Sequence, residues 1–199
     1  GAPGDPKAPF GHYTDTRFGA FAALPSADYV CSTFVNTRVD DRDWFPDNMP
    51  AFPKVAPASG TNLTWTRQLL FVKDPSPAGP AWLLLRDTAA SGQPTAWQFW
   101  TLSEKIGTPD QTKDPAAFLA DKPGRTNLPA RELPMSDRYT ALGQFEMDVE
   151  YLVASPAQTP RHTLRFGGPN GGNAQIPEWQ DLLHLQLPGD GAYYVALFP

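Results

Sequence analysis

The chain has 199 residues, a formal net charge of −5 at pH 7, and 6 Trp, 6 Tyr and 12 Phe. This aromatic content argues against a disordered chain, and the acidic balance with scattered Lys and Arg argues against nucleic acid as a partner. No run approaches the roughly 18 apolar residues that a membrane span needs, so we expect no membrane span. The 23 Pro and 16 Gly, together with the aromatic residues, are typical of short strands joined by long, stiff loops.

The N-terminal part of the chain predicts a leader followed by a hairpin and a long loop. Residues 1–16 are polar, rich in Gly and Pro and aperiodic, so we expect a leader or linker there and a single domain over residues 17–199. Residues 17–24 and 27–37 predict a hairpin around Pro25 and Ser26. Residues 38–61 then form a long loop with four prolines and the aromatic residue Trp44. Loops of this length are often functional.

Residues 65–102 predict three strands and two turns. The first strand, residues 65–72, alternates its side chains between two faces. The prolines of residues 74–80 cannot donate to a strand ladder, so the chain turns there, and it turns again at residues 91–94. Arg67 and Asp87 lie near the ends of successive antiparallel strands. An unpaired charge beside an apolar strand is costly, so we expect both to be hydrogen-bonded, with each other as one option.

The second half of the chain predicts loops and further strands. Residues 106–134 carry five prolines and look loop-like, apart from a short helix at 114–119 with Asp114 as its N-cap. Residues 143–154, 161–166, 179–187 and 192–198 predict strands, with a tight hairpin turn at 189–191. The fold class is therefore predicted to be all-β, a large antiparallel β-sandwich of about ten or more strands with long proline-rich loops.

Aromatic residues on an exposed face of a strand offer a candidate sugar site. Trp97 and Phe99 share one face of their strand, and Trp100 lies on the other. If the core takes Trp97 and Phe99, then Trp100 is free to stack on a sugar ring together with Trp44 on the long loop. Trp44 and Trp100 are thus the predicted substrate-binding residues. The alternative is that the rings of the 97–102 strand are all buried in the core.

The histidines give no catalytic constellation within the chain. A lyase can use a His/Tyr pair to remove a proton beside a uronate carboxylate and to protonate the leaving oxygen. His12 and Tyr13 have the right chemistry, but adjacent side chains on an extended chain point to opposite faces. His162 opens a strand, and His184 is interpreted as a solvent-facing residue on the polar face of a late strand. No catalytic residue is therefore predicted here.

Metal and cofactor motifs are also missing from the sequence. The single Cys31 allows no intrachain disulfide and no cysteine-based zinc cluster. Asp40, Asp41 and Asp43 lack the spacing and the glycine of a calcium loop, so a solvated charge run is the better interpretation. We predict no metal and no cofactor. Five arginines that are moderately close in sequence suggest that a local basic groove for an acidic polysaccharide can exist on this acidic chain: Arg125, Arg131, Arg138, Arg161 and Arg165.

A family resemblance extends over most of residues 17–199. The order Arg67-Gln68-x-Leu70-Phe71-Val72, followed by an apolar strand ending in Arg86-Asp87 and then by an aromatic strand, resembles the β-sandwich region of heparinase II/III-like polysaccharide lyases. Residues 19–21 and 27–30 look like the two preceding strands of that family, and residues 193–199 look like its closing strand.

The resemblance implies a polysaccharide partner, which can be acidic, and a secreted, periplasmic or cell-surface location. In that family the catalytic Tyr and His lie mostly on an N-terminal helical toroid, and the reaction is β-elimination. The chain would then complete a cleft built by the remainder of a longer polypeptide or a helical domain, and it would not be active alone. The alternative is a non-catalytic carbohydrate-binding or structural surface module, which the missing catalytic constellation favours.

Overall fold

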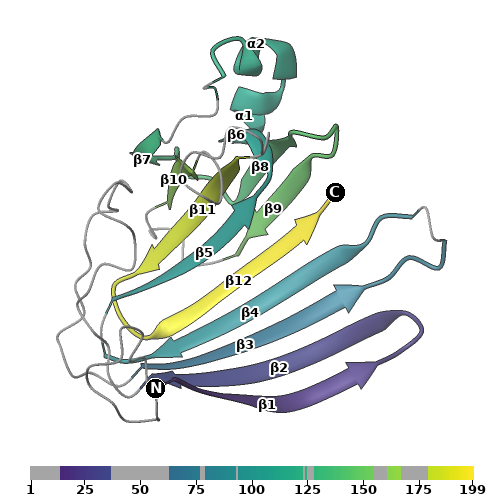
Figure 1. The fold of residues 1–199 in the computed structure, drawn as a ribbon, viewed down its shortest axis with the longest axis vertical. Coiled ribbons are helices and arrows are strands. Elements are labelled where there is room, and N and C mark those ends of the chain that lie inside the picture. The colour runs from purple at the N-terminus through teal and green to yellow at the C-terminus, as the bar shows by residue number, and fades with distance from the viewer. Residues whose placement is uncertain are drawn as a thin grey trace.

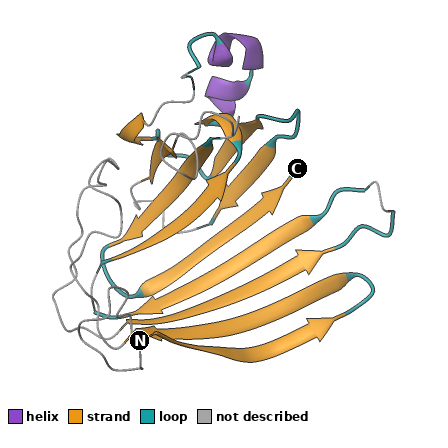
Figure 2. Ribbon diagram, in the orientation of Figure 1, coloured by secondary structure: helices purple, strands orange, loops and turns teal. Residues whose placement is uncertain are grey.

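The computed structural model describes residues 14–36, 63–76, 79–92, 94–122, 124, 128–154, 161–166 and 179–199. Over these residues the chain forms two antiparallel sheets, as the sequence predicts, with the helices confined to one end (Figures 1 and 2). The strands are β1 (Thr14–Ala23), β2 (Ala27–Asn36), β3 (Leu63–Val72), β4 (Trp82–Ala90), β5 (Thr95–Thr101), β6 (Ser103–Gly107), β7 (Leu128–Glu132), β8 (Arg138–Gly143), β9 (Val149–Val153), β10 (Arg161–Phe166), β11 (Gln180–Leu187) and β12 (Gly191–Phe198).

The two sheets differ in size. The large sheet has eight strands in the order β1-β2-β3-β4-β12-β9-β8-β6, and the small sheet has four in the order β5-β11-β10-β7. Figure 1 shows β1, β2 and β3 extending beyond the small sheet. Phe18 and Phe21 on the edge strand β1 are accordingly exposed, at 81% and 69%. The packed core therefore belongs to the central and later strands of the large sheet.

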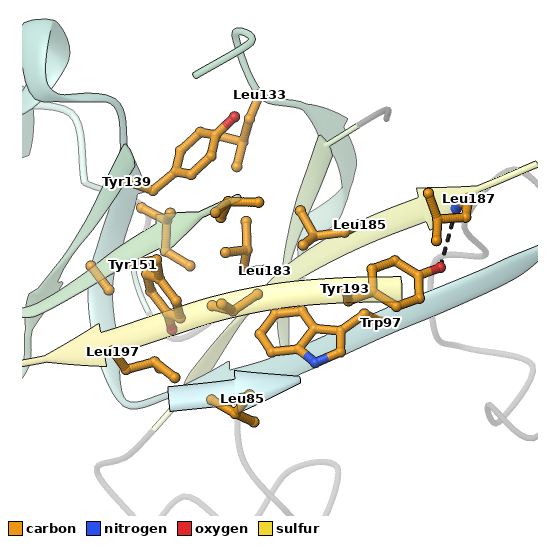
Figure 3. Packing of buried hydrophobic residues seen from close by; sticks show 14 residues of the cluster. Leu85, Trp97, Leu133, Tyr139, Tyr151, Leu183, Leu185, Leu187, Tyr193 and Leu197 are labelled. Carbon is orange, nitrogen blue, oxygen red and sulfur yellow. Dashed lines mark hydrogen bonds between the residues drawn. The ribbon is translucent and has the colours of Figure 1, made fainter. Parts of the chain in front are cut away.

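The core lies between the two sheets and is built from the inward-facing residues of each (Figure 3). Leu183 and Leu185 of β11 are fully buried there, as their alternation along the strand predicts. Trp97 is 1% exposed and stacks on Phe99 with ring centroids 5.9 Å apart. Tyr193 places its ring in the core from the opposite sheet, and its hydroxyl is hydrogen-bonded to Thr95 Oγ1 at 2.9 Å. A buried phenol of this kind needs such a partner.

The predicted local elements are confirmed at two places. Chain reversal between β1 and β2 occurs at Pro25 and Ser26. The helix α2 (Pro115–Leu119) has Asp114 as its N-cap, whose carboxylate accepts a hydrogen bond from the Ala117 N–H at 3.1 Å. The segment around it contains more structure than its prolines predict, because α1 (Pro109–Thr112) precedes α2 and β7 follows it.

The predicted strand over residues 143–154 is wrong as a single element. It is split between the end of β8 and β9 by a turn in which Glu146 has a φ of 59°. At Gly143 the backbone approaches Met147 so closely that a Cβ atom would lie 1.8 Å from the Met147 carbonyl oxygen. Only glycine fits at this position. Gly143 therefore marks the start of this turn in the sequence. The apolar residues on either side of the turn led to the prediction of one continuous strand.

The connection at residues 189–191 is also not the predicted hairpin, because β11 belongs to the small sheet and β12 to the large one. Leu187 and Tyr193 both face the core. Because β11 and β12 lie in opposite sheets, each strand turns its own apolar face towards that core. The Leu187 N–H donates to the Tyr193 hydroxyl at 3.1 Å across the bend (Figure 3). Asp190 accepts hydrogen bonds from the N–H groups of Ser91 and Gly92 at 2.6 and 2.7 Å, which joins this connection to the β4–β5 connection.

Candidate functional site

The outer face of the large sheet carries its side chains in rows that follow the strand register. Gln68 on β3 lies opposite Arg86 on β4, which in turn lies opposite Tyr194 on β12. These three side chains point away from the core, because the neighbouring residues Leu85 and Val195 point into it. The register thus gathers an amide, a guanidinium and a phenol from three strands in one row.

This polar row is held together by side-chain hydrogen bonds. Gln68 Nε2 donates to the hydroxyl of Tyr29 on β2 at 2.9 Å, and a guanidinium nitrogen of Arg86 donates to Gln68 Oε1 at 2.6 Å. Arg86 Nε also donates to the Tyr194 hydroxyl at 3.4 Å, and the Arg86 Cζ lies 5.8 Å from the centre of that ring. These contacts fix the direction of each group before a ligand arrives, which reduces the entropy lost on binding.

A row of apolar side chains runs beside the polar row. Leu70, Leu84, Ala196 and Leu152 follow one another in register across β3, β4, β12 and β9. Leu84 and Leu152 are 39% and 37% exposed, although both are large and apolar. The outer face of this sheet therefore places an exposed apolar stripe directly against a line of hydrogen-bonding groups.

A hollow of about 380 Å³ lies over the two rows. On the same face, Trp82 of β4 stacks on Phe198 of β12, with ring centroids 4.4 Å apart. Trp82 and Tyr194 remain 37% and 42% exposed, so their rings are accessible. The residues that line the hollow are Tyr29, Gln68, Leu69, Leu70, Leu84, Leu85, Arg86, Leu152, Ala154, Tyr194, Val195 and Ala196.

Sequence reasoning missed this face. The signal was present, because Gln68 and Arg86 stand at alternate positions to Leu69 and Leu85 in neighbouring strands. The sequence alone does not indicate which strand pairs with β4 on the side away from β3. Only the pairing of β4 with β12 brings Tyr194 to Arg86, and these residues are far apart along the chain.

The predicted sugar platform lies elsewhere. Trp97 and Phe99 face the core, as the platform prediction assumes. Trp100 lies on the other face of β5, opposite Leu182. Trp100 is half-buried. Trp44 falls outside the described residues, so the pairing of the two rings stays a prediction. Trp100 belongs to the outer face of the small sheet, on the far side of the sandwich from the hollow.

The interpretation of His184 as solvent-facing is wrong, because only 2% of the residue is exposed. Leu182 and Leu164 on the same face of the small sheet are equally buried, so the alternation along β11 does not separate core from solvent there. Gln98 Nε2 lies 3.2 Å from His184 Nδ1, and the ring of His162 lies 5.9 Å away in an edge-to-face arrangement. Burial, with a smaller contribution from His162, lowers the pKa of His184 to about 4. The imidazole is therefore neutral at pH 7.

The arginines proposed for a basic groove do not line one groove within the described chain. Arg165 is buried and bonded to Asp181 at 2.7 Å, and it also donates to the backbone carbonyl of Glu104. Arg161 is buried and donates to the Ser136 carbonyl at 3.1 Å, while Arg138 pairs with Glu150 at 2.5 Å. Arg125 lies outside the described residues. Arg131 and Arg165 line one small hollow, which Arg138 and Arg161 do not line.

The described residues contain neither a metal-binding cluster nor a membrane-spanning helix. Within them, no group of three or more His, Cys, Asp and Glu side chains is arranged to hold a metal ion. His12, Asp40, Asp41 and Asp43 lie outside this part of the chain. In the same described segments, the helices are too short and too polar to cross a membrane.

Comparison with protein-family models gives no match for this chain, and comparison with curated proteins gives none either. The fold defines the protein as an antiparallel β-sandwich. Its candidate site is the hollow on the outer face of the large sheet.

Proposed function

We propose that this domain binds polysaccharide in the hollow on the outer face of the large sheet. The observation that carries the proposal is the polar row of Gln68, Arg86 and Tyr194 lying against the exposed apolar row of Leu84 and Leu152. A pyranose ring has the matching character, with an apolar face of C–H groups and an edge of hydroxyls. Aromatic rings and aliphatic groups contact the first, and fixed donors and acceptors bind the second.

The dimensions and chemistry of the hollow support a sugar ligand. Its volume of about 380 Å³ falls at the lower end of the roughly 300–1,000 Å³ that is usual for ligand sites. Tyr29 and Tyr194 stand at the two ends of the polar row, so each offers both a ring and a hydroxyl. Arg86 supplies a fixed cation between them, which favours a sugar that carries a carboxylate or sulfate.

The biological setting that we propose is the β-sandwich portion of a heparinase II/III-like polysaccharide lyase, or of a relative. The hollow would form one wall of a polysaccharide cleft, and the main catalytic residues would come from the remainder of a longer polypeptide or a helical domain. The apolar row that includes Leu84 and Leu152 extends beyond what one sugar ring covers, which favours a neighbouring surface beside the ligand. We propose a location outside the cytoplasm, where such polysaccharides occur.

The alternative proposal is a non-catalytic carbohydrate-binding or structural surface module. It uses the same hollow and differs in the absence of a catalytic partner. The mass of the native polypeptide separates the two, because a product of several hundred residues that begins with a helical domain supports the lyase. A mature chain that starts near Gly1 supports the module.

The experiment that tests binding is a calorimetric titration of the domain with oligosaccharides of heparin, alginate and a neutral glucan. Arg86→Ala removes the central donor of the polar row. Arg138→Ala is the matched control, because Arg138 is an exposed arginine on the same sheet that pairs with Glu150 and does not line the hollow. The proposal requires that Arg86→Ala weakens binding of at least one oligosaccharide and that Arg138→Ala leaves the same binding unchanged.

A further inference from the structure

A second, smaller hollow of about 200 Å³ lies at the helical end of the sandwich. It is bounded by β6, β7, β10 and β11, with Asp121 just after α2. Three cationic side chains and two carboxylates line it, which leaves one positive charge without a counterpart among these residues. The charged residues are Lys105, Arg131, Arg165, Asp121 and Asp181.

Two of the three cations are committed to carboxylates. Arg165 bonds Asp181 through two nitrogens, each 2.7 Å from a carboxylate oxygen. Lys105 Nζ lies 2.7 Å from Asp121 Oδ1 and donates to the Phe118 carbonyl at 2.8 Å. These pairs use the anionic groups of the hollow and hold its walls in place.

Arg131 provides the remaining charge. Within the described chain its guanidinium makes one side-chain hydrogen bond, to the Ile106 carbonyl at 3.3 Å, and it has no carboxylate at ion-pair distance. A guanidinium carries five N–H donors in one plane, and this hydrogen bond uses one of them. Partial burial lowers the pKa of Arg131 from its usual value, because neighbouring atoms displace some of the water around the guanidinium. The carboxylates of Asp181 and Asp121 raise this pKa, and the cation of Arg165 lowers it.

An anion in this hollow would offset both the partial loss of water around Arg131 and the repulsion between Arg131 and Arg165. It would replace the lost water with charge-assisted hydrogen bonds, and it would screen Arg131 from Arg165. Leu128, Pro129 and Thr163 also line the hollow, whose volume of about 200 Å³ suits a small ligand. Part of Arg131 remains exposed to solvent, so a ligand from solution can reach the hollow.

We propose that this hollow binds one small oxyanion, with the guanidinium of Arg131 as its main contact and Lys105 beside it. The group is a sulfate, a phosphate or a carboxylate, which share the planar pairs of oxygen atoms that a guanidinium fork recognises. The proposal stands apart from sugar binding on the large sheet, because the two hollows share no residue.

The test is calorimetric titration of the whole chain with sodium sulfate, sodium phosphate and sodium glucuronate, each against sodium chloride at equal ionic strength. We expect saturable binding of at least one oxyanion at about millimolar concentration and none of chloride. Sulfate or phosphate binding without glucuronate identifies a tetrahedral anion as the ligand. Glucuronate binding that Arg131→Gln weakens and Arg86→Ala leaves unchanged identifies a carboxylate in this hollow.

Three variants locate the site. Arg131→Gln should weaken binding by about tenfold or more, because it removes the charge and the fork. Arg131→Lys should keep part of the affinity, and Lys113→Gln should leave it unchanged, since Lys113 is an exposed lysine outside the hollow. A urea-unfolding curve of each variant, compared with that of the unaltered chain, checks that the variant is folded. Absence of saturable binding overturns the proposal, and so does equal loss of affinity in Arg131→Gln and Lys113→Gln.

Discussion

Arg67 and Asp87 form a charged pair across β3 and β4. Arg67 Nε lies 3.0 Å from both carboxylate oxygens, and a terminal guanidinium nitrogen lies 2.6 Å from Asp87 Oδ2. The Asp87 side chain is fully buried, whereas 38% of the Arg67 side chain is exposed. The pair therefore joins β3 and β4 by charge-assisted hydrogen bonds, and the prediction that both residues are hydrogen-bonded is confirmed.

Arg67→Ala should lower the free energy of unfolding by about 2–3 kcal/mol, because it leaves the Asp87 carboxylate buried without its cation. Partial exposure of Arg67 keeps the loss below that of a fully buried pair. Urea unfolding at neutral pH measures it. Arg86→Ala, the neighbour of Asp87 on the opposite face, should cost about 1 kcal/mol or less. Equal losses in the two variants would show that the Arg67 pair does not stabilise the core.

Stability should depend on pH through His184. Its pKa is about 4 in the folded protein and near the ordinary value of 6.5 when unfolded, so the unfolded state binds the proton first on acidification. The contribution is fully present above about pH 6.5, declines as the pH falls towards 4 and amounts to at most about 3 kcal/mol.

His184→Gln should flatten this dependence, because glutamine does not titrate. Urea unfolding of both proteins between about pH 7.5 and 4.5 measures the difference. An identical slope with pH in the two proteins would assign the acid sensitivity to other groups.

The domain alone should release no unsaturated uronate from heparin or alginate, because the proposed lyase mechanism takes its proton-abstracting residues from outside this chain. Ultraviolet absorbance of the unsaturated product follows the reaction. Robust turnover by the purified domain would refute the proposal that it forms only one wall of the cleft.

The sequence-derived platform makes a separate prediction. If Trp100 and Trp44 stack on sugar, then replacing both by alanine should weaken polysaccharide binding by roughly 1–3 kcal/mol and leave the fold intact. Calorimetry measures the affinity, and far-UV circular dichroism checks the fold. Unfolding of the double variant would show instead that these rings belong to the core.

Much of the fold could be predicted because its signals are local. Two-residue alternation marks β3 and β11, and the N-cap Asp114 marks α2. The errors arise where a signal is not local. Gly189 to Gly191 looks like a hairpin turn, but whether the following strand pairs with β11 or crosses to the other sheet depends on where both apolar faces find a core.

The site was less predictable than the fold for the same reason. Each member of the polar row is an ordinary outward-facing residue within its own strand. Only the order β3-β4-β12 brings Gln68, Arg86 and Tyr194 together, and β12 is distant in sequence from the other two strands. His184 shows the converse error, because a polar alternation predicted solvent at a position that is buried.

Polysaccharide binding to the outer face of the large sheet is tested most directly by comparing Arg86→Ala and Tyr194→Ala with Arg138→Ala and Trp100→Ala in one oligosaccharide titration. The two hollow variants should each weaken binding by about 1–3 kcal/mol, since each removes a charged or aromatic contact. Arg138→Ala should bind as the unaltered domain does. Unchanged affinity in both Arg86→Ala and Tyr194→Ala, with binding lost in Trp100→Ala, would contradict this account and place the sugar on the small sheet.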